Sequence, residues 1–265
     1  MNKQINEIQE HYKQVAKEHG LNKSSTMADE VIRDKETNFI INHLSYDCRI
    51  LEVGCGNGFL AEKIKEVCGN TVTYVGIDFS AEMISLATKR KLGKNYKFEV
   101  GDVRTIEGEY DIIIAQRCLI NLTSWEEQKR ALLALKSCLS FKKMKDQHTN
   151  QCPRIILVEV FQEEYDFFNK ARNDVGLEPM KPAFHNYYLT NKKTDAVMAN
   201  EICGECELVE DNQFLSSYLF GSRILYPAFT KDIAYNSAFV QFFADMPPFG
   251  KYSYIKGKVY ARSNV

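Results

Sequence analysis

One run constrains the fold of this 265-residue chain more than any other segment: ILEVGCGNGFLA, residues 50–61. An apolar strand pattern leads directly into three glycines at alternate positions, Gly54, Gly56 and Gly58. Glycine adopts backbone conformations that other residues avoid, and its missing side chain lets the backbone come close to a ligand. The run therefore predicts a strand, a sharp turn against a ligand, and a helix that begins at the turn.

Glycine-rich turns between a strand and a helix also hold dinucleotides, so the spacing has to discriminate between ligands. A dinucleotide site reads G-x-G-x-x-G and places a pyrophosphate on the helix N-terminus. Here the third glycine comes one position early, and the carboxylate of Glu52 precedes the glycines. A carboxylate suits a ligand with a cationic amino group better than one with two phosphates. Asp78, which ends the next apolar run, can accept two ribose hydroxyls and fits either ligand.

The same run resembles a family signature. The order hydrophobic, hydrophobic, acidic, any, Gly, any, Gly, any, Gly resembles motif I of class I S-adenosylmethionine-dependent methyltransferases, with Glu52 as the acidic member. Later segments resemble further motifs of this family in the same order: FEVGDVR (98–104), YDIIIA (110–115) and RCLINLTSW (117–125). The last string is similar to a bacterial subgroup that is met in surface-polysaccharide and natural-product pathways.

The resemblance implies a fold and a cofactor. It implies a Rossmann-like α/β class I methyltransferase, with a mostly parallel seven-stranded sheet, an antiparallel edge strand, and S-adenosylmethionine as the methyl donor that becomes S-adenosylhomocysteine. Within one globular unit, we expect an N-terminal helical cap over 1–45 and a cofactor-binding core over 46–160. Residues 161–265 are expected to hold an acceptor-binding insert and the last two strands.

Hydrophobic periodicity places the individual elements. Strands are expected at 49–53, 72–77, 96–100, 111–115 and 154–159, and helices at 3–19, 59–68, 81–91 and 124–139. Thr26 is expected to cap a further helix, with Asp29 as the acidic member of a capping box. The last two strands are expected within 206–224 and 252–261, and the polar stretch 142–151 is expected to form a loop.

The resemblance also assigns residues to the cofactor. Asp78 would accept the ribose hydroxyls, Asp102 would accept from the adenine amino group, and Val103 would pack on the adenine ring. Tyr12 and Arg33 belong to the cap, which in related enzymes closes over the methionine end of the cofactor. The expected cofactor-binding residues are Tyr12, Arg33, Glu52, Gly54, Cys55, Gly56, Asn57, Gly58, Asp78, Phe79, Met83, Asp102, Val103 and Gln116.

Acceptor recognition is expected after residue 160, where aromatic side chains become frequent. Aromatic walls are typical of small-molecule pockets, although the core beneath a sheet uses aromatic residues too. His185 is a candidate general base and fits the role of a pocket-wall donor equally well. Arginines match phosphate and carboxylate oxygens, and structural ion pairs explain single arginines as well. The candidate catalytic residues are His185, Arg117 and Tyr187, and the candidate substrate-binding residues are Arg172, Asn186, Tyr188, Tyr218 and Arg223.

Composition argues against several classes of partner. With 34 Lys and Arg against 35 Asp and Glu, no general attraction to nucleic acid or to an anionic membrane is expected. The polar N-terminus and the lack of a long apolar segment predict a cytoplasmic protein. The one CxxC, formed by Cys203 and Cys206, has no second ligand pair nearby, so a turn is favoured there over a metal or redox site.

These features predict methyl transfer to a small-molecule acceptor. The expected accepting atom is an oxygen of a nucleotide-linked sugar or of a phosphate- or phosphoramidate-bearing capsule precursor. Nitrogen comes second, because Gln116-Arg117-Cys118 stands after the fourth strand, where many nucleic-acid and protein N-methyltransferases carry Asn-Pro-Pro-Tyr. Two other classes stay open: a non-catalytic S-adenosylmethionine-binding protein, and an NAD-dependent oxidoreductase, which the glycine spacing disfavours.

Overall fold

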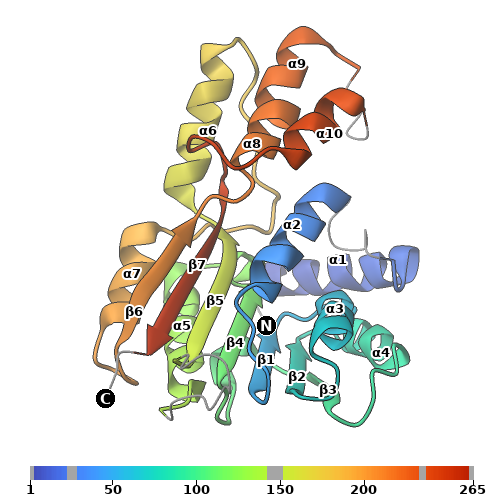
Figure 1. Cartoon of the computed structure of the whole chain (residues 1–265), viewed down its shortest axis with the longest axis vertical. Coiled ribbons are helices and arrows are strands. Elements are labelled where there is room, and N and C mark those ends of the chain that lie inside the picture. Colours follow the sequence, from blue (N-terminus) through green and yellow to red (C-terminus); the bar gives the residue numbers. More distant parts are fainter. Residues whose placement is uncertain (1–2, 23–28, 142–151, 233–236, 263–265) are drawn as a thin grey trace.

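A computed structural model of the chain describes residues 3–22, 29–141, 152–232 and 237–262. The strands in this part are β1 (Arg49–Val53), β2 (Thr73–Asp78), β3 (Tyr96–Val100), β4 (Ile112–Gln116), β5 (Arg154–Val160), β6 (Cys206–Asn212) and β7 (Ile255–Arg262). They form one sheet in the order β3-β2-β1-β4-β5-β7-β6 (Figure 1). β1 to β5 run parallel, and β7 runs antiparallel to both β5 and β6. The predicted Rossmann-like fold with an antiparallel edge is confirmed.

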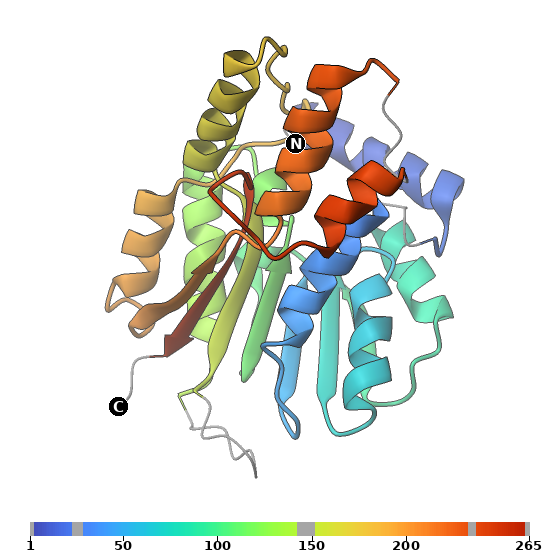
Figure 2. The same cartoon turned by 45° about the horizontal axis from the view of Figure 1, so that its top comes forward.

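Helices cover both faces of the sheet (Figure 2). They are α1 (Lys3–His19), α2 (Glu30–Ile41), α3 (Phe59–Cys68), α4 (Ala81–Lys89), α5 (Trp125–Cys138), α6 (Gln162–Asp174), α7 (Asn191–Ala199), α8 (Ser216–Leu219), the π-helix η4 (Phe220–Leu225), α9 (Tyr226–Phe229) and α10 (Ala238–Asp245). Two short 3₁₀ turns, η2 (Val103–Thr105) and η3 (Leu119–Asn121), follow β3 and β4. None of the helices in the described ranges is long and apolar enough to span a membrane.

Successive side chains of each strand point to opposite faces of the sheet, so they pack in two separate apolar clusters. Ile50 of β1 packs in one apolar cluster with Ile40 of α2 and Ile64 of α3. Its neighbour Leu51 packs in a second cluster with Leu132 of α5. Both faces of the parallel strands are therefore buried, which explains why their sequences are continuous apolar runs.

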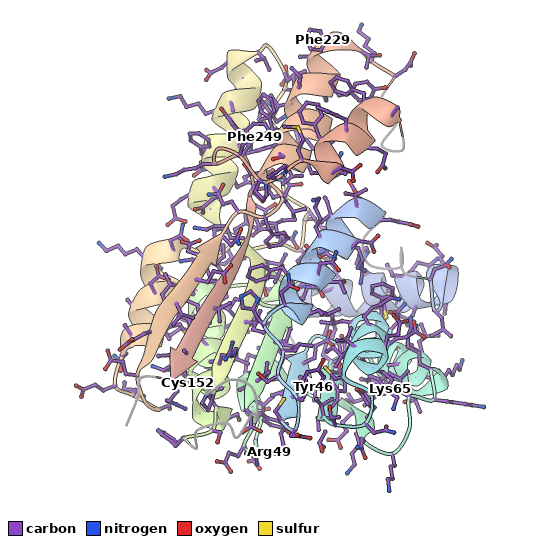
Figure 3. All side chains as sticks on the ribbon, viewed as in Figure 1. Tyr46, Arg49, Lys65, Cys152, Phe229 and Phe249 are labelled. Atoms are coloured by element: carbon purple, nitrogen blue, oxygen red, sulfur yellow. The ribbon has the colours of Figure 1, made fainter. Side chains whose placement is uncertain are left out.

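The strand order creates a crevice at the carboxyl edge of the sheet. The chain moves outward from β1 to β2 and β3 and then returns to β4 on the other side of β1. Ligands of open α/β sheets bind at such a reversal. Arg49, at the amino end of β1, and Phe229, in α9, mark opposite ends of the molecule (Figure 3). The helices α6, α8, α9 and α10 therefore lie on the side of the carboxyl edge (Figure 1).

Most predicted elements are confirmed, and the region 206–224 is a correction. The strand β6 ends at Asn212, and helical turns run from Ser216 to Phe229. Tyr218 and Arg223 are therefore in helices and not in a strand. The physical reason is a helical burial period: Leu215, Tyr218, Leu219 and Ser222 are all fully buried, at spacing i, i+3, i+4 and i+7.

The start of the second helix is also corrected. Asp29 is itself the N-cap of α2: it has extended backbone angles, and its side chain accepts from the N–H of Ile32 at 3.2 Å. Asp29 is therefore the cap itself and not the acidic member of a capping box, because aspartate is a strong N-cap in its own right. Thr26 and the predicted loop 142–151 lie outside the described residues.

Candidate active site

A cavity of about 670 Å³ lies at the carboxyl edge of the sheet. The glycine turn after β1 and the ends of β2 and β4 form one side of it, through residues such as Gly56, Asp78 and Arg117. The other side comes from β5, α6, the segment after α6 and the start of β7. Helix α1 covers part of the cavity with Ile8 and two later residues, His11 and Val15.

The glycines of the turn are required by geometry. Gly54, Gly56 and Gly58 all have positive φ, at 71°, 53° and 75°. A Cβ atom on Gly54 would lie 2.8 Å from the Cβ and Sγ atoms of Cys118, and one on Gly58 would lie 3.0 Å from the Cβ atom of Ala87. Such contacts are too short for real side chains. The turn can therefore pack against Cys118 and Ala87 in this way only with glycine at positions 54 and 58.

Asp78 ties the end of β2 to the glycine turn. Its Oδ2 accepts from the N–H of Gly56 at 2.9 Å, and its Oδ1 accepts from the N–H of Ser80 at 2.9 Å. Burial raises the pKa of this carboxyl, while the two backbone donors lower it. Each carboxylate oxygen has a second lone pair, so Asp78 can still accept from a ligand in the cavity.

Glu52 and Arg33 bring buried charge to the cavity. Glu52 is 3% exposed, and it accepts a hydrogen bond from the hydroxyl of Tyr74. Burial raises the pKa of Glu52 to about 7. Arg33 is 6% exposed and stacks over the ring of Phe59 at 5.3 Å, and burial with repulsion from Arg117 lowers its pKa to about 10. A carboxyl and a guanidinium group thus face one end of the cavity.

Asn57 and Arg90 fasten the segment after α1 to the glycine turn. The Nδ2 of Asn57 donates to the carbonyl oxygens of Gly20 at 3.0 Å and Asn22 at 3.1 Å. Arg90 donates to the carbonyl of Asn57 at 2.7 Å and to that of Leu21 at 2.9 Å. Asn57 therefore has a structural contact that the sequence did not predict, in addition to its place in the cavity lining.

Asp102 is engaged by a neighbouring arginine. It accepts from the Nε of Arg104 at 2.9 Å, and this contact is the main reason that the pKa of Asp102 lies below its usual range. The Nη1 of Arg104 also donates to Glu127 of α5 at 2.6 Å. The carboxylate is thus largely neutralised by an ion pair. Val103, the next residue, lines the cavity and is buried.

Glu36 of α2 holds two residues that follow each other at the end of β4. It is fully buried, and its Oε2 accepts from the Nε2 of Gln116 at 2.6 Å. Its Oε1 lies 3.2 Å from the Nε of Arg117. Arg117 has φ of 47°, a left-handed conformation that is uncommon for residues other than glycine. A buried ion pair therefore holds a strained arginine at the edge of the cavity.

Glu159, at the end of β5, supports the same turn from the other side. It is fully buried, and its Oε1 accepts from the N–H groups of Cys118 at 2.9 Å and Leu119 at 2.8 Å. Burial raises the pKa of Glu159 to about 8, against the effect of these donors. Glu159 was absent from the sequence predictions, because it occupies an inner position of a strand that reads as apolar.

Two histidines meet over the cavity. The rings of His11, from α1, and His185, from the segment after α6, have centroids 5.0 Å apart. Phe184 packs edge-on against both rings, at 6.0 Å and 4.8 Å. Burial is the main cause that lowers the pKa of His185, and electrostatic repulsion from His11 lowers it further. His11 was not predicted, since it is one polar residue on an amphipathic helix.

We expect this histidine contact to weaken in acid. Because the folded-state pKa of His185 lies below about 6.5, the folded protein binds fewer protons here than the unfolded chain. Stability from the contact is complete above that pH and is lost as the pH falls below it. As the pH is lowered from about 7 to about 5, the amide-exchange rate of α1, corrected for the intrinsic rate, should increase. The rise should be smaller in His11→Gln, and a flat profile in the wild type would contradict it.

Most of the predicted site residues line the cavity. They are Arg33, Glu52, Gly54, Cys55, Gly56, Asn57, Asp78, Phe79, Asp102, Val103, Gln116, Arg117, His185, Asn186 and Tyr188. Gly58 and Met83 lie outside the lining: Gly58 is the N-cap of α3, and Met83 is fully buried in α4. The side chain of Tyr12 is outside the part of the chain that the structure describes.

Four predicted acceptor-site residues lie elsewhere, and this is a correction. Tyr218 donates to Asp29 at 2.9 Å, and Arg223 forms an ion pair with the same carboxylate. Arg172 donates to the carbonyl oxygens of Arg223 and Glu178. These contacts join α6 and the π-helix to the cap of α2, so these side chains do not line the cavity.

The fourth is Tyr187. Its side chain is 43% exposed, and its backbone bonds to Ile120 and Gln128 place the chain beside the cavity without adding the side chain to its lining.

The cysteines are all free thiols. Cys203 has φ of 62° and precedes β6, which begins at Cys206, so the predicted turn at the CxxC is confirmed. Within the described ranges, no group of three histidine, cysteine or acidic side chains could hold a metal ion.

Comparisons with known proteins agree with this geometry. Residues 44–164 match a family model described as "Methyltransferase domain". A curated relative, malonyl-[acyl-carrier protein] O-methyltransferase of Bacillus anthracis, is 26% identical over 181 residues, which is 64% of this chain and 62% of the relative. The chain therefore aligns with less than two thirds of that relative's length.

Solved structures share the fold. Magnesium protoporphyrin IX methyltransferase of Synechocystis PCC 6803, with bound SAM, has a TM-score of 0.58 at 12% identity, covering 99% of both chains. The N-methyltransferase NodS of Bradyrhizobium japonicum WM9, in complex with S-adenosyl-L-homocysteine, has a TM-score of 0.55 at 11% identity, covering 95% of this chain and 97% of that one. With its glycine turn, its strand order and the methyltransferase-domain match over residues 44–164, the chain has the fold of the class I S-adenosylmethionine-dependent methyltransferases.

Proposed function

We propose that this protein transfers a methyl group from S-adenosylmethionine to an oxygen of a small, anionic acceptor. The observation that carries the proposal is a single cavity that joins the glycine turn to a cationic wall. In this proposal, residues 1–45 act as a cap, 46–160 bind the cofactor, and 161–265 shape the acceptor side. The cofactor supplies a methyl group that is already activated by a sulfonium, so the protein has to position and desolvate the acceptor.

The residues of the cofactor half fit the donor. Gly54 and Gly56 of the glycine turn line the cavity with backbone alone, which allows a ligand to come close. Glu52 would hold the cationic amino group, Arg33 the carboxylate, and Asp78 the ribose hydroxyls. Phe79 is 37% exposed and would lie against the adenine with Val103. Asp102 can still accept from the adenine amino group, although its ion pair with Arg104 weakens it as an acceptor.

Charge is distributed unevenly along the cavity. Its acidic lining residues are Glu52, Asp78, Asp102 and Glu127, and all of them belong to the ends of β1 to β3 or to α5. The basic lining residues are Arg33 and Arg104 in the same half, and His11, Arg117, Lys181 and His185 in the rest of the cavity. Arg117 and Lys181 supply the positive charge of this part, because the lowered pKa of His185 leaves its ring neutral at neutral pH. This charge favours an acceptor that carries a carboxylate or a phosphate.

The acceptor proposal keeps one part of the sequence-based expectation and drops another. An anionic oxygen stays, because Arg117 lies in the cavity lining. The capsule precursor is not carried forward, because Arg172 and Arg223 are engaged in contacts between helices. Oxygen is preferred over nitrogen because the curated relative is named as an O-methyltransferase. An anionic oxygen needs no general base, so His185 is proposed as a wall residue of the acceptor half.

The test is transfer of a labelled methyl group. The protein is incubated with methyl-labelled S-adenosylmethionine and three acceptor sets: carboxylic acids, phosphate esters and neutral alcohols. We expect S-adenosylhomocysteine to form with an anionic set. A carboxyl methyl ester releases methanol in mild base, whereas phosphate methyl diesters, ethers and N-methyl groups do not, so methanol release identifies a carboxylate acceptor. Mass fragmentation of a base-stable product identifies its methylated atom. A base-stable N-methyl product, or turnover with neutral alcohols alone, would contradict the proposal.

The same experiment separates the other classes. Binding of S-adenosylmethionine without turnover on any acceptor set, or with a lysate metabolite mixture, would favour a non-catalytic binding protein. Tight binding of NADH in place of S-adenosylmethionine would contradict the proposed function.

A further inference from the structure

Tyr254 lies where the last strand meets the cavity. It directly precedes β7, whose first residue, Ile255, pairs with Val160 at the end of β5. The N–H of Phe161 donates to the carbonyl oxygen of Tyr254 at 3.2 Å. Val160, Tyr254 and Ile255 all line the cavity. The antiparallel pairing of β7 with β5 therefore carries Tyr254 to the carboxyl edge of the sheet, on the acceptor side.

The ring of Tyr254 is held by aromatic contacts with α6. It packs edge-on against Tyr165, with ring centroids 5.8 Å apart and planes at 84°. It also packs against Phe168, at 5.0 Å and 71°. Edge-to-face packing of this kind fixes the orientation of a ring. The hydroxyl of Tyr254 therefore has a defined position.

This hydroxyl differs from those of three buried tyrosines. The hydroxyl of Tyr165 donates to the carbonyl of Met180 at 2.5 Å, that of Tyr218 to Asp29 at 2.9 Å, and that of Tyr260 to Asp195 at 2.5 Å. For Tyr254, the described ranges of the chain contain no hydrogen-bond partner of the hydroxyl. Tyr254 is half-buried and lines the cavity, so a ligand there can accept from its hydroxyl in place of water.

The chemistry of the site makes this hydroxyl a donor. Burial is the main cause that raises the pKa of Tyr254 to about 12, while Arg223 and Arg117 lower it. At neutral pH the phenol is therefore protonated and has a hydrogen to donate. The matching acceptor atom is an oxygen with high electron density, such as a carboxylate or phosphate oxygen.

We propose that Tyr254 binds the acceptor by donating a hydrogen bond from its hydroxyl to an anionic oxygen in the cavity that Arg117 also lines. This inference rests on the proposed function and names a residue that the sequence did not single out. Tyr254 holds the acceptor and leaves the cofactor half untouched, so its removal should affect one ligand only.

The test uses malonate and inorganic phosphate as probes, titrated calorimetrically onto protein saturated with S-adenosylhomocysteine. We expect at least one of them to bind the wild type, and Tyr254→Phe to bind it about tenfold more weakly, which is the loss of one hydrogen bond to a charged group. The matched control is Tyr252→Phe, since Tyr252 is two residues away and packs on Phe220 outside the cavity lining. The control should bind the probe as the wild type does.

Three results would overturn the assignment. They are equal probe affinity in Tyr254→Phe and the wild type, an equal loss in Tyr252→Phe, and no binding of either probe to the wild type at millimolar concentration. Affinity for S-adenosylhomocysteine, measured on every variant, reports whether the fold is intact. A wild type that binds a probe through Tyr254 yet transfers no methyl group would contradict the proposed function and leave this assignment standing.

Discussion

Replacing Asp78 with alanine is expected to lower the affinity for S-adenosylhomocysteine at least a hundredfold. Two charge-assisted hydrogen bonds to the ribose, at about 1.5 kcal/mol each, amount to about 3 kcal/mol. The substitution also removes the acceptor for the N–H groups of Gly56 and Ser80, so the glycine turn loses its support. Isothermal titration calorimetry on the folded variant measures the change.

Asp78→Asn is the matched control for this experiment. Its amide oxygen can still accept from one backbone N–H, while its charge is lost, so the affinity should fall between those of the wild type and Asp78→Ala. Glu82→Ala, a change in the first turn of α4 outside the cavity lining, should bind normally. Unchanged binding in a folded Asp78→Ala variant would show that the ribose lies elsewhere.

Removal of Glu36 is expected to destabilise the protein by about 3 to 5 kcal/mol, because it breaks a buried ion pair with the guanidinium group of Arg117. The side chain of Glu36 is 0% exposed, and that of Arg117 is 15% exposed, so water replaces the ion pair poorly. Arg33 adds a second positive charge nearby. Glu36→Ala should therefore shift the midpoint of thermal unfolding down by roughly 10 °C.

A double variant tests the cause of that loss. If the unpaired charge of Arg117 is responsible, Glu36→Ala combined with Arg117→Ala should be more stable than Glu36→Ala alone. Glu36→Gln keeps an oxygen for the amide of Gln116 and should fall between the wild type and Glu36→Ala. Full additivity of the two alanine substitutions would mean that the pair contributes no coupling energy.

The cofactor side of the cavity follows from local sequence. β1, the glycine turn and α3 are contiguous over 49–68, so the hydrophobic pattern and the glycine spacing of this one segment predict all three. Acidic residues at strand ends reach the carboxyl edge automatically in a parallel sheet. The placement of Glu52, Asp78 and Asp102 around the cavity could therefore be predicted. The partner of Asp102 could not, because an arginine two residues along can face either the aspartate or solvent.

The acceptor side depends on contacts between distant segments. Glu36 meets Gln116 across 80 positions, and Asp29 meets Tyr218 across 189. The local sequence pattern cannot predict which distant side chains will pair. Many polar residues could pair equally well until the packing of the helices decides which of them meet. Arg223 shows how such a prediction fails. We expected it in a strand on the acceptor side, but it lies in a helix and forms an ion pair with Asp29, the cap of α2.

The sequence by itself determined the fold class, the cofactor family and the position of the glycine turn, because these depend on short-range backbone geometry and on the apolar period of single elements. The tertiary structure decided which polar side chains share the cavity. It brought His11 and Tyr254 into the lining, placed Glu36 behind Gln116 and Arg117, and excluded Arg172 and Arg223. The physical reason is that β7 inserts between β5 and β6, and α1, α2 and α6 dock on the carboxyl edge, through long-range packing that no local segment encodes.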